Sequence, residues 1–450
     1  MITKFNHSGM HSMRKRALVI FTSLFFLLFL PFFAKAQDFL SVEDAIKIGL
    51  AKNYSVMIVK NQQEIVKAQN NLGNAGMSPT VTALANLGLA SLNSHQVFNT
   101  GVVQDRVGAQ NNTTGASINA AWNVFDGLRM FAVKKRLDLN EQLSEFQLRQ
   151  QMENTTYSII VTYYNTVKVN ELIKAAKQNL QIYEERLKIS ELKLQIGSDS
   201  KVEVLLSRSD VNKAKSAIIQ LELDRLNAKV LLNTLLARSA DVDYTVSDSI
   251  VVDYNPNLGD LKKSVTQTNS SILISKQNEL ILSHGVKEVR ANNLPLIQLN
   301  GAYIYTRNRS QAGIVFLNRQ NGLNGGLSAY WLLFNGNRNN RLVKERNILA
   351  LNQRYVTEQT QLQIDGLVYV SYRSYLLNKQ IVSMETQNLA DSREVQTISL
   401  ERYKIGKANL LETIETQKNL EDAQVRYINA LYAIKVAEAE LLRVNGSLVK

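Results

Sequence analysis

Two carboxylates near the end of the chain could attract cations. Glu412 and Glu415 are three residues apart in a segment without proline, so on a helix they would lie on one face. If several such helices surrounded one axis, the carboxylates would form charged rings, which favour cations over anions. The alternative interpretation is an ordinary solvated helix surface, because glutamates are frequent along this chain.

Other reactive groups are sparse. The chain has no cysteine, which excludes disulfides and thiolate metal sites. His95 and His284 stand alone in the sequence, so neither is expected to bind a metal or to act in a triad. Four aspartates between residues 241 and 253 match no calcium-loop spacing, which favours a solvated connector. We therefore predict no enzyme, no metal site and no cofactor.

A duplicated pattern indicates which elements surround these residues. Residues 122–127 read WNVFDG, and residues 331–336 read WLLFNG at an offset of 209. The Ile-Gly pairs that end at Gly197 and Gly406 share this offset, and both glycines are predicted helix ends. Matching spacings of this kind indicate that one supersecondary unit has been duplicated.

Each copy is predicted to contain one β-hairpin. After Pro79 and Pro295, apolar and polar residues alternate with a period of two, and Gly/Asn-rich turns are expected near 93–115 and 308–322. Each strand is expected to contain about 9–11 residues, which is enough to cross a bilayer at a tilt. About eight strands are needed to close a barrel, so four strands per chain predict that neighbouring subunits complete it.

Long helices are predicted to follow the hairpins. About 70 residues without proline follow Asp126 and Asn335, the expected N-caps, and would extend about 105 Å. The shorter helix after Gly406 has apolar residues at alternating spacings of three and four, which predicts coiled-coil packing. One further helix is expected from residue 42 to about residue 75.

The domain boundaries follow from these patterns. A basic segment, an apolar run and an Ala-Lys-Ala site indicate a signal peptide at 1–36. Its removal deletes five basic residues and lowers the net charge from +13 to +8, and no basic stripe suggests nucleic-acid binding. The first repeat comprises 37–240, with a hairpin at about 80–125, a long helix at about 127–196 and a helix at about 200–237. After a linker at 241–258, the second repeat comprises 259–450, with corresponding elements at about 296–335, about 337–405 and about 409–443.

The doubled helix–hairpin–helix–turn–helix unit, the strand-ending motifs and the Ile-Gly turns resemble the TolC-type outer membrane efflux family over the whole mature chain. The resemblance implies an α+β membrane protein that forms a homotrimer. Each protomer would contribute four strands to a 12-stranded barrel in the outer membrane, continued by a long α-helical coiled-coil barrel in the periplasm. The implied partners are outer membrane lipid, a periplasmic adaptor (membrane fusion) protein and an inner-membrane transporter.

The resemblance also implies roles for particular residues. The turns at Gly197 and Gly406 would form the periplasmic tip, and Glu412 and Glu415 would form the acidic rings of the pore aperture.

Two further positions match residues that link inner and outer coils in the closed state. They are Tyr403 in the second copy and Glu203 in the first. The family's linking arginine is replaced by Ala408, and the neighbouring Lys407 is a candidate substitute.

The predicted function is a passive exit duct of a multi-component efflux or type I secretion system, opened at its periplasmic end by the adaptor and the pump. The alternative is a periplasmic coiled-coil adaptor or scaffold without a pore. Adaptors usually place a single helical hairpin between compact β domains, whereas this chain has two hairpin-bearing units, which favours the duct.

Overall fold

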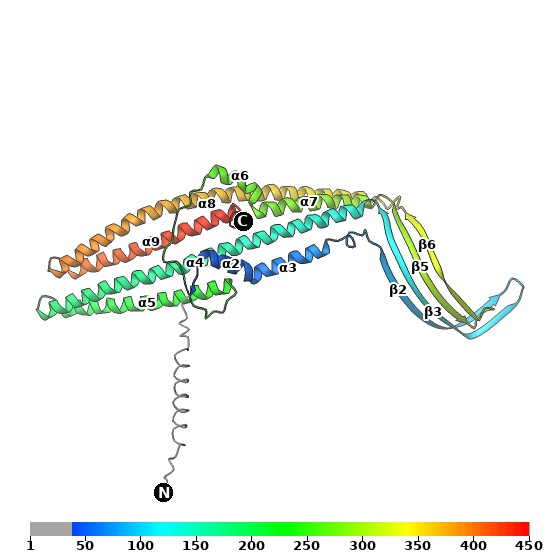
Figure 1. Cartoon of the computed structure of the whole chain (residues 1–450), viewed down its shortest axis with the longest axis horizontal. Helices are drawn as coiled ribbons and strands as arrows, with labels where there is room; N and C mark the ends of the chain where they lie inside the picture. Colours follow the sequence, from blue (N-terminus) through cyan, green and yellow to red (C-terminus); the bar gives the residue numbers. More distant parts are fainter. Residues whose placement is uncertain (1–37, 450) are drawn as a thin grey trace, which may run out of the picture.

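The protein is a long helical rod with a curved β-sheet at one end (Figure 1). The computed structural model describes residues 38–449, so the predicted signal peptide at 1–36 lies outside the described residues. The first repeat contains β1 (Asp38–Phe39), α2 (Val42–Lys52), α3 (Tyr54–Gln69), β2 (Thr80–Val97), β3 (Val103–Asp126), α4 (Arg129–Gln195) and α5 (Lys201–Leu235). After β4 (Tyr244–Thr245), the second repeat contains α6 (Leu258–Thr268), α7 (Ser270–Ala291), β5 (Leu296–Ser310), β6 (Leu317–Tyr330), α8 (Arg338–Lys404) and α9 (Leu410–Val444).

The two hairpins form a single sheet. Its strand order is β2-β3-β5-β6, with every neighbouring pair antiparallel. The repeats meet where β3 pairs with β5, and β2 and β6 are left as the two edges. This arrangement confirms the predicted fold class, in which one chain contributes four strands.

The strands are longer than expected. They contain 18, 24, 15 and 14 residues, and the connections between paired strands are confined to residues 98–102 and 311–316. The Gly/Asn-rich segments predicted as turns are therefore mostly strand. Polarity in these segments indicates contact with water, and backbone pairing between adjacent strands tolerates polar side chains.

One face of the sheet is apolar and exposed in a single chain. Leu87, Leu89, Leu323 and Leu327 are 70%, 72%, 85% and 68% exposed. Apolar side chains at this level of exposure require lipid or another protein surface. Among residues 38–449, none of the helices combines the length and apolarity needed to cross a bilayer.

The four long helices occur as two similar pairs. Both α4 and α8 contain 67 residues, and both α5 and α9 contain 35 residues. Apolar residues of the predicted seam on α9 are buried, with Leu420, Ala423 and Ile434 exposed by no more than 2%. The packing of α8 against α9 confirms the coiled-coil prediction.

The amino-terminal helix differs from the prediction, because it is two helices. Asn53 separates α2 from α3, and its side chain accepts a hydrogen bond from the amide of Ser55 at 2.9 Å, which caps the second helix. Its Nδ2 also donates to the carbonyl oxygen of Leu235 at 2.9 Å. In the second repeat, Nδ2 of Asn269 donates to the carbonyl oxygen of Val444 at 2.8 Å. Each asparagine thus joins a helix break to the end of a coiled-coil helix.

Two residues in the left-handed conformation connect each hairpin to the long helix that follows it. Gly127 and Leu128 have φ values of 72° and 68°, and a Cβ atom at Gly127 would lie 2.4 Å from the carbonyl oxygen of Ala291. Asp126 does accept a hydrogen bond from the amide of Met130 at 2.9 Å, but the N-cap position is Leu128. In the second copy the N-cap is Asn337, where Asn335 was expected. Both helices therefore begin later than predicted, because two left-handed residues redirect the chain first.

The tryptophans of the repeated motif stabilise these junctions. Nε1 of Trp122 donates to the carbonyl oxygen of Met77 at 2.8 Å, and Nε1 of Trp331 donates to that of Asn293 at 3.0 Å. Each tryptophan binds the segment that enters its own hairpin. The motif recurs because the same junction is built twice.

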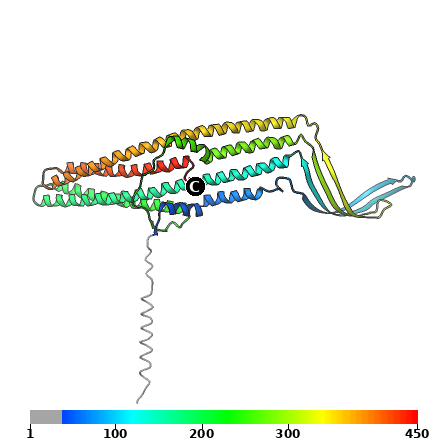
Figure 2. The same cartoon turned by 45° about the horizontal axis from the view of Figure 1, so that its top comes forward.

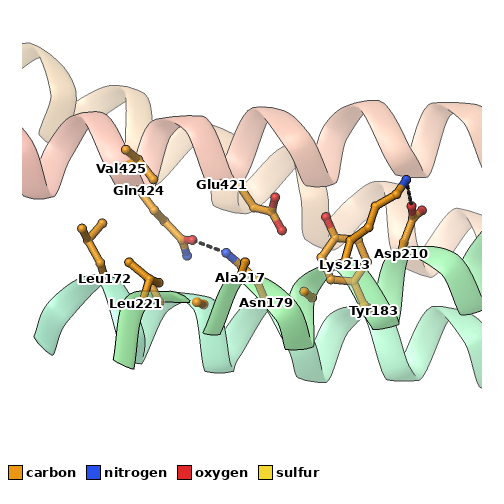
Figure 3. Close-up of a pocket in the computed structure, with 13 residues that line it drawn as sticks. Leu172, Asn179, Tyr183, Asp210, Lys213, Ala217, Leu221, Glu421, Gln424 and Val425 are labelled. Atoms are coloured by element: carbon orange, nitrogen blue, oxygen red, sulfur yellow. Dashed lines mark hydrogen bonds and ion pairs between the residues drawn. The ribbon is translucent and has the colours of Figure 1, made fainter. Parts of the chain in front are cut away.

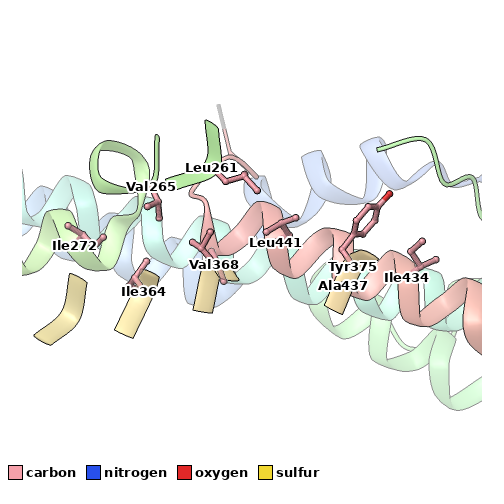
Figure 4. Close-up of a cluster of buried hydrophobic side chains, with 10 residues drawn as sticks. Leu261, Val265, Ile272, Ile364, Val368, Tyr375, Ile434, Ala437 and Leu441 are labelled. Carbon is pink, nitrogen blue, oxygen red and sulfur yellow. The ribbon is translucent and has the colours of Figure 1, made fainter. Parts of the chain in front are cut away.

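Two apolar clusters hold the middle of the rod together. Ile159 and Leu232 belong to one cluster, and Val368 and Leu441, 209 residues later, belong to the other (Figure 4). The linker contributes to the first cluster, because β4 pairs with β1 and Tyr244 is fully buried. The linker is anchored to the rod through Tyr244 and Val246, whereas the four aspartates at 241, 243, 248 and 253 are exposed, as expected for a solvated connector.

Candidate functional site at the helical tip

The two helical turns lie together at the end of the rod that is remote from the sheet (Figure 2). Gly197 and Gly406 have φ values of 74° and 73°, the left-handed conformation that ends a helix. The next helices are capped by Ser200 and Asn409, whose side chains accept hydrogen bonds from the amides three residues later. The predicted tip turns are thus helix ends of equivalent geometry.

Tyr403 joins the two coiled-coil pairs at the tip. Its ring is 1% exposed, and its hydroxyl lies 2.9 Å from Oγ of Ser190 and donates to Oδ2 of Asp199 at 3.0 Å. Burial, together with the hydrogen bond to Asp199, raises the pKa of Tyr403 to about 12, although the Ser190 contact acts in the other direction. The hydroxyl therefore stays protonated and acts as a donor.

The carboxylate that Tyr403 contacts differs from the expected one. The family resemblance implied a contact between Tyr403 and Glu203, whereas the hydroxyl donates its hydrogen bond to Asp199. Glu203 contacts Tyr403 indirectly, because it shares a hydrogen bond with Asp199. This shared bond, followed by desolvation and the negative charge of Asp199, raises the pKa of Glu203 to about 7. Asp199 and Glu203 therefore form a hydrogen-bonded pair of acidic residues next to the Tyr403 hydroxyl.

Two lysines form further contacts between α4 and α8 near Tyr403. Nζ of Lys193 lies 3.7 Å from the centre of the Tyr403 ring, within the range of a cation–π interaction. Lys404 forms an ion pair with Glu185 of α4 at 2.8 Å. Both interactions connect the first repeat with the second. The tip therefore combines a buried hydroxyl with charges that hold α4 and α8 together.

The predicted aperture residues lie on the first turns of α9. Glu415 is exposed, whereas Glu412 is half-buried and pairs with Nη1 of Arg402 at 2.9 Å. Nη2 of Arg402 also donates to the carbonyl oxygen of Lys407 at 3.2 Å. An arginine therefore does act at this turn, although Ala408 occupies the position where the family resemblance placed it. Arg402 bridges α8 and α9 within one repeat.

A groove lies farther along the rod, between α4, α5 and α9 (Figure 3). Its volume is about 490 Å³, and Nδ2 of Asn179 donates to Oε1 of Gln424 across it at 2.7 Å. Nearby, Arg186 is only 1% exposed and pairs with Asp210, while burial raises the pKa of Glu421. The hydrogen bond from Asn179 to Gln424 connects the two coiled-coil pairs between the tip and the apolar clusters, whereas Arg186 and Asp210 join α4 to α5 within the first pair.

The sequence alone does not predict that Ser190 and Asp199 contact Tyr403 at the tip. Ser190 and Asp199 resemble ordinary helix and turn residues, and only the approach of α8 brings Tyr403 to them. Their partners lie more than 200 residues away, so spacing gives no signal. Within residues 38–449, no cluster of His, Asp or Glu is arranged to bind a metal.

Comparisons with known proteins agree with this architecture. The family model described as outer membrane efflux protein matches residues 46–238 and 265–447, one segment per repeat. The chain therefore belongs to the outer membrane efflux protein family. No curated protein matches the sequence significantly.

Solved structures with the same fold are outer membrane channels. The Campylobacter jejuni CmeC outer membrane channel has a TM-score of 0.77 at 15% identity, covering 91% of this chain and 86% of that one. VceC of Vibrio cholerae has a TM-score of 0.75 at 13% identity, with 90% and 96% covered. The open state of the Neisseria gonorrhoeae MtrE channel has a TM-score of 0.71 at 16% identity, with 90% and 89% covered.

The family match and the fold define the class of the protein. It is a TolC-type outer membrane efflux channel, with its sheet in the outer membrane and its helices in the periplasm. Proteins of this family and its structural neighbours are passive channels rather than enzymes. The alternative of a pore-free adaptor is not favoured.

Proposed function

We propose that three copies of the chain assemble around one axis into a conduit for outward transport. The observation that carries the proposal is the four-stranded sheet with two edges, β2 and β6, and one exposed apolar face. Pairing β6 of one copy with β2 of the next would satisfy the backbone groups that lipid leaves without partners. Three copies would give 12 strands, above the roughly eight required for closure.

The helical tip is proposed as the gate of this conduit. Tyr403, Asp199 and Glu203 would keep the coiled-coil pairs together in the closed state. Glu412 and Glu415 would place six carboxylates around the axis. Because Arg402 pairs with Glu412, Glu415 would carry the larger part of the ring's charge.

Opening is proposed to depend on two partners, a periplasmic adaptor and an inner-membrane transporter. The chain itself is proposed to do no chemistry and to transduce no energy, because its sequence has no phosphate-binding loop. An adaptor would act by binding the coiled coils near the tip and separating α8 and α9 from α4. The contacts at the tip are polar, so contacts with a partner or with water can replace them, whereas the apolar clusters farther along the rod lose stability when exposed to water.

Assembly can be tested by gel migration and fractionation. A trimeric barrel should migrate as an oligomer in detergent gels without boiling and should sediment with outer membranes. A monomer found only in the soluble periplasmic fraction would refute the conduit and favour the adaptor alternative.

The gate assignment can be tested by ion selectivity in planar bilayers. We expect E412Q/E415Q to lower the preference for cations, and E415Q alone to account for most of the loss. The matched control is E345Q/D391N, which removes two exposed carboxylates from α8 away from the turn. Selectivity equal to wild type in E412Q/E415Q would refute the acidic ring.

A further inference from the structure

Three arginines lie together on the second hairpin, far from the helices. Arg307 and Arg309 are on β5, and Arg319 is on β6. The strand register places Arg307 directly opposite Arg319, and Arg309 opposite Leu317. All three side chains are exposed. We call these three residues the arginine cluster.

The arginine cluster continues the apolar face of the sheet. Side chains alternate between faces along a strand, so Arg307 and Arg309 lie on the same face as Tyr303 and Tyr305. Tyr303 is opposite Leu323 on β6, which is 85% exposed. The polar face carries the intervening residues. The cluster therefore lies on the face directed toward lipid, outside the lumen.

The charge of the cluster is not neutralised within the chain. Residues 296–335 include no Asp or Glu, and none of the three arginines forms an ion pair within residues 38–449. Arg309 stacks on the ring of Phe316 at 4.7 Å, which positions the guanidinium without changing its charge. Like charges directly opposite each other on a sheet are destabilising. An anionic ligand would remove this cost.

The height of the cluster identifies the source of the anion. Leu299, opposite Leu327 near the start of β5, marks the end of the apolar face that is closer to the helices. Eight residues separate Leu299 from Arg307, a distance of about 27 Å along a strand and of about 20 Å along the membrane normal at a tilt of about 40°. The apolar band of such barrels is about 25 Å tall. The guanidinium groups therefore lie where the hydrocarbon layer ends and headgroups begin, on the side away from the helices.

We propose that the arginine cluster binds the phosphate groups of anionic lipid headgroups in the outer leaflet. The inference rests on the membrane placement of the sheet described above. Guanidinium groups bind phosphate oxygens in a bidentate manner, and paired arginines can share one phosphate. Binding would fix the height of the barrel in the membrane and compensate the repulsion between Arg307 and Arg319.

The proposal can be tested with the assembled protein in nanodiscs. The probes are a phosphorylated glycolipid of the lipid A type and its enzymatically dephosphorylated form, with retained lipid measured by native mass spectrometry. The variant is R307Q/R319Q. The matched control is K262Q/K263Q, which removes two exposed positive charges from α6, outside the sheet.

We expect the wild type and K262Q/K263Q to retain the phosphorylated lipid in preference to the dephosphorylated form. Each interfacial positive charge contributes enough that R307Q/R319Q should bind the phosphorylated lipid about thirtyfold more weakly. The charge-conserving variant R307K/R319K should keep most of the preference, and it serves as the test if R307Q/R319Q does not assemble.

Four results would overturn the proposal. The first three are equal retention of both lipids by the wild type, unchanged retention by R307Q/R319Q, and complete displacement of the lipid by millimolar inorganic phosphate, which would indicate a simple anion site. The fourth is loss of all preference in R307K/R319K, which would exclude recognition by positive charge. Conductance of the same samples tests the conduit separately, because a channel without lipid preference would still conduct.

Discussion

Replacing Tyr403 by phenylalanine removes one oxygen atom from the centre of the tip. The ring is buried and its shape is kept, so the change acts on the two hydrogen bonds of the hydroxyl, to Ser190 and to Asp199. Ser190 keeps a partner, because its Oγ also lies 3.2 Å from Oγ of Ser207. Asp199 keeps only its bond with Glu203 on this side. The loss therefore falls mainly on the bond to the carboxylate.

The magnitude follows from the type of bond. A hydrogen bond to a charged group contributes about 1.5–3 kcal/mol, so we take about 2 kcal/mol per protomer for Tyr403→Phe. This corresponds to about a thirtyfold shift from closed to open for one protomer. If three protomers open together, the contributions add to about 6 kcal/mol, and the open state would predominate.

Single-channel recording in planar bilayers measures this shift directly. We expect Tyr403→Phe to open more often and to conduct more than the wild type. The control is Tyr369→Phe on the same helix, where the side chain is 51% exposed and should have no effect. A Tyr403→Phe trimer that assembles normally and gates like the wild type would refute the role of this hydroxyl in closure.

Two other perturbations test the tip and the body of the rod. Because the pKa of Glu203 is raised to about 7, its protonated form stabilises the closed tip at low pH, and this contribution is lost as the pH rises from about 4.5 through 7. Conductance should therefore increase over that range in the wild type and stay flat in Glu203→Gln; identical pH profiles would contradict this reasoning. In the apolar cluster, Leu441→Ala should destabilise the folded chain by about 3 kcal/mol, whereas Leu362→Ala, at a position 75% exposed, should change little. Thermal unfolding in detergent measures the difference, and equal effects would show that the cluster does not determine stability.

Periodicity was sufficient to predict the repeated architecture. The absence of proline from 127–196 and the alternation beyond Pro295 are local properties that predict helices and strands, and the offset of 209 residues shows that their order is repeated. Heptad spacing also predicted the buried face of α9. The local patterns depend on residues close in sequence, so they can be recognised without knowledge of the fold.

Precise boundaries and the contacts of the tip required the tertiary structure. The helix break at Asn53 depends on a bond to Leu235, and the late start of α4 depends on the approach of Ala291 to Gly127. Likewise, strands extend through segments whose composition resembles turns, because pairing between strands does not depend on apolar side chains.

The duplicated sequence by itself determined that the chain consists of two hairpins and two pairs of long helices. It also determined that one chain has too few strands to close a barrel. The tertiary structure decided that Tyr403 contacts Asp199 and not Glu203, and that Arg402 pairs with Glu412. The physical reason is the separation in sequence of the residues involved. Hydrophobic periodicity depends on residues in neighbouring helical turns, whereas a hydrogen bond between residues 204 positions apart forms only once the two coiled coils have packed together.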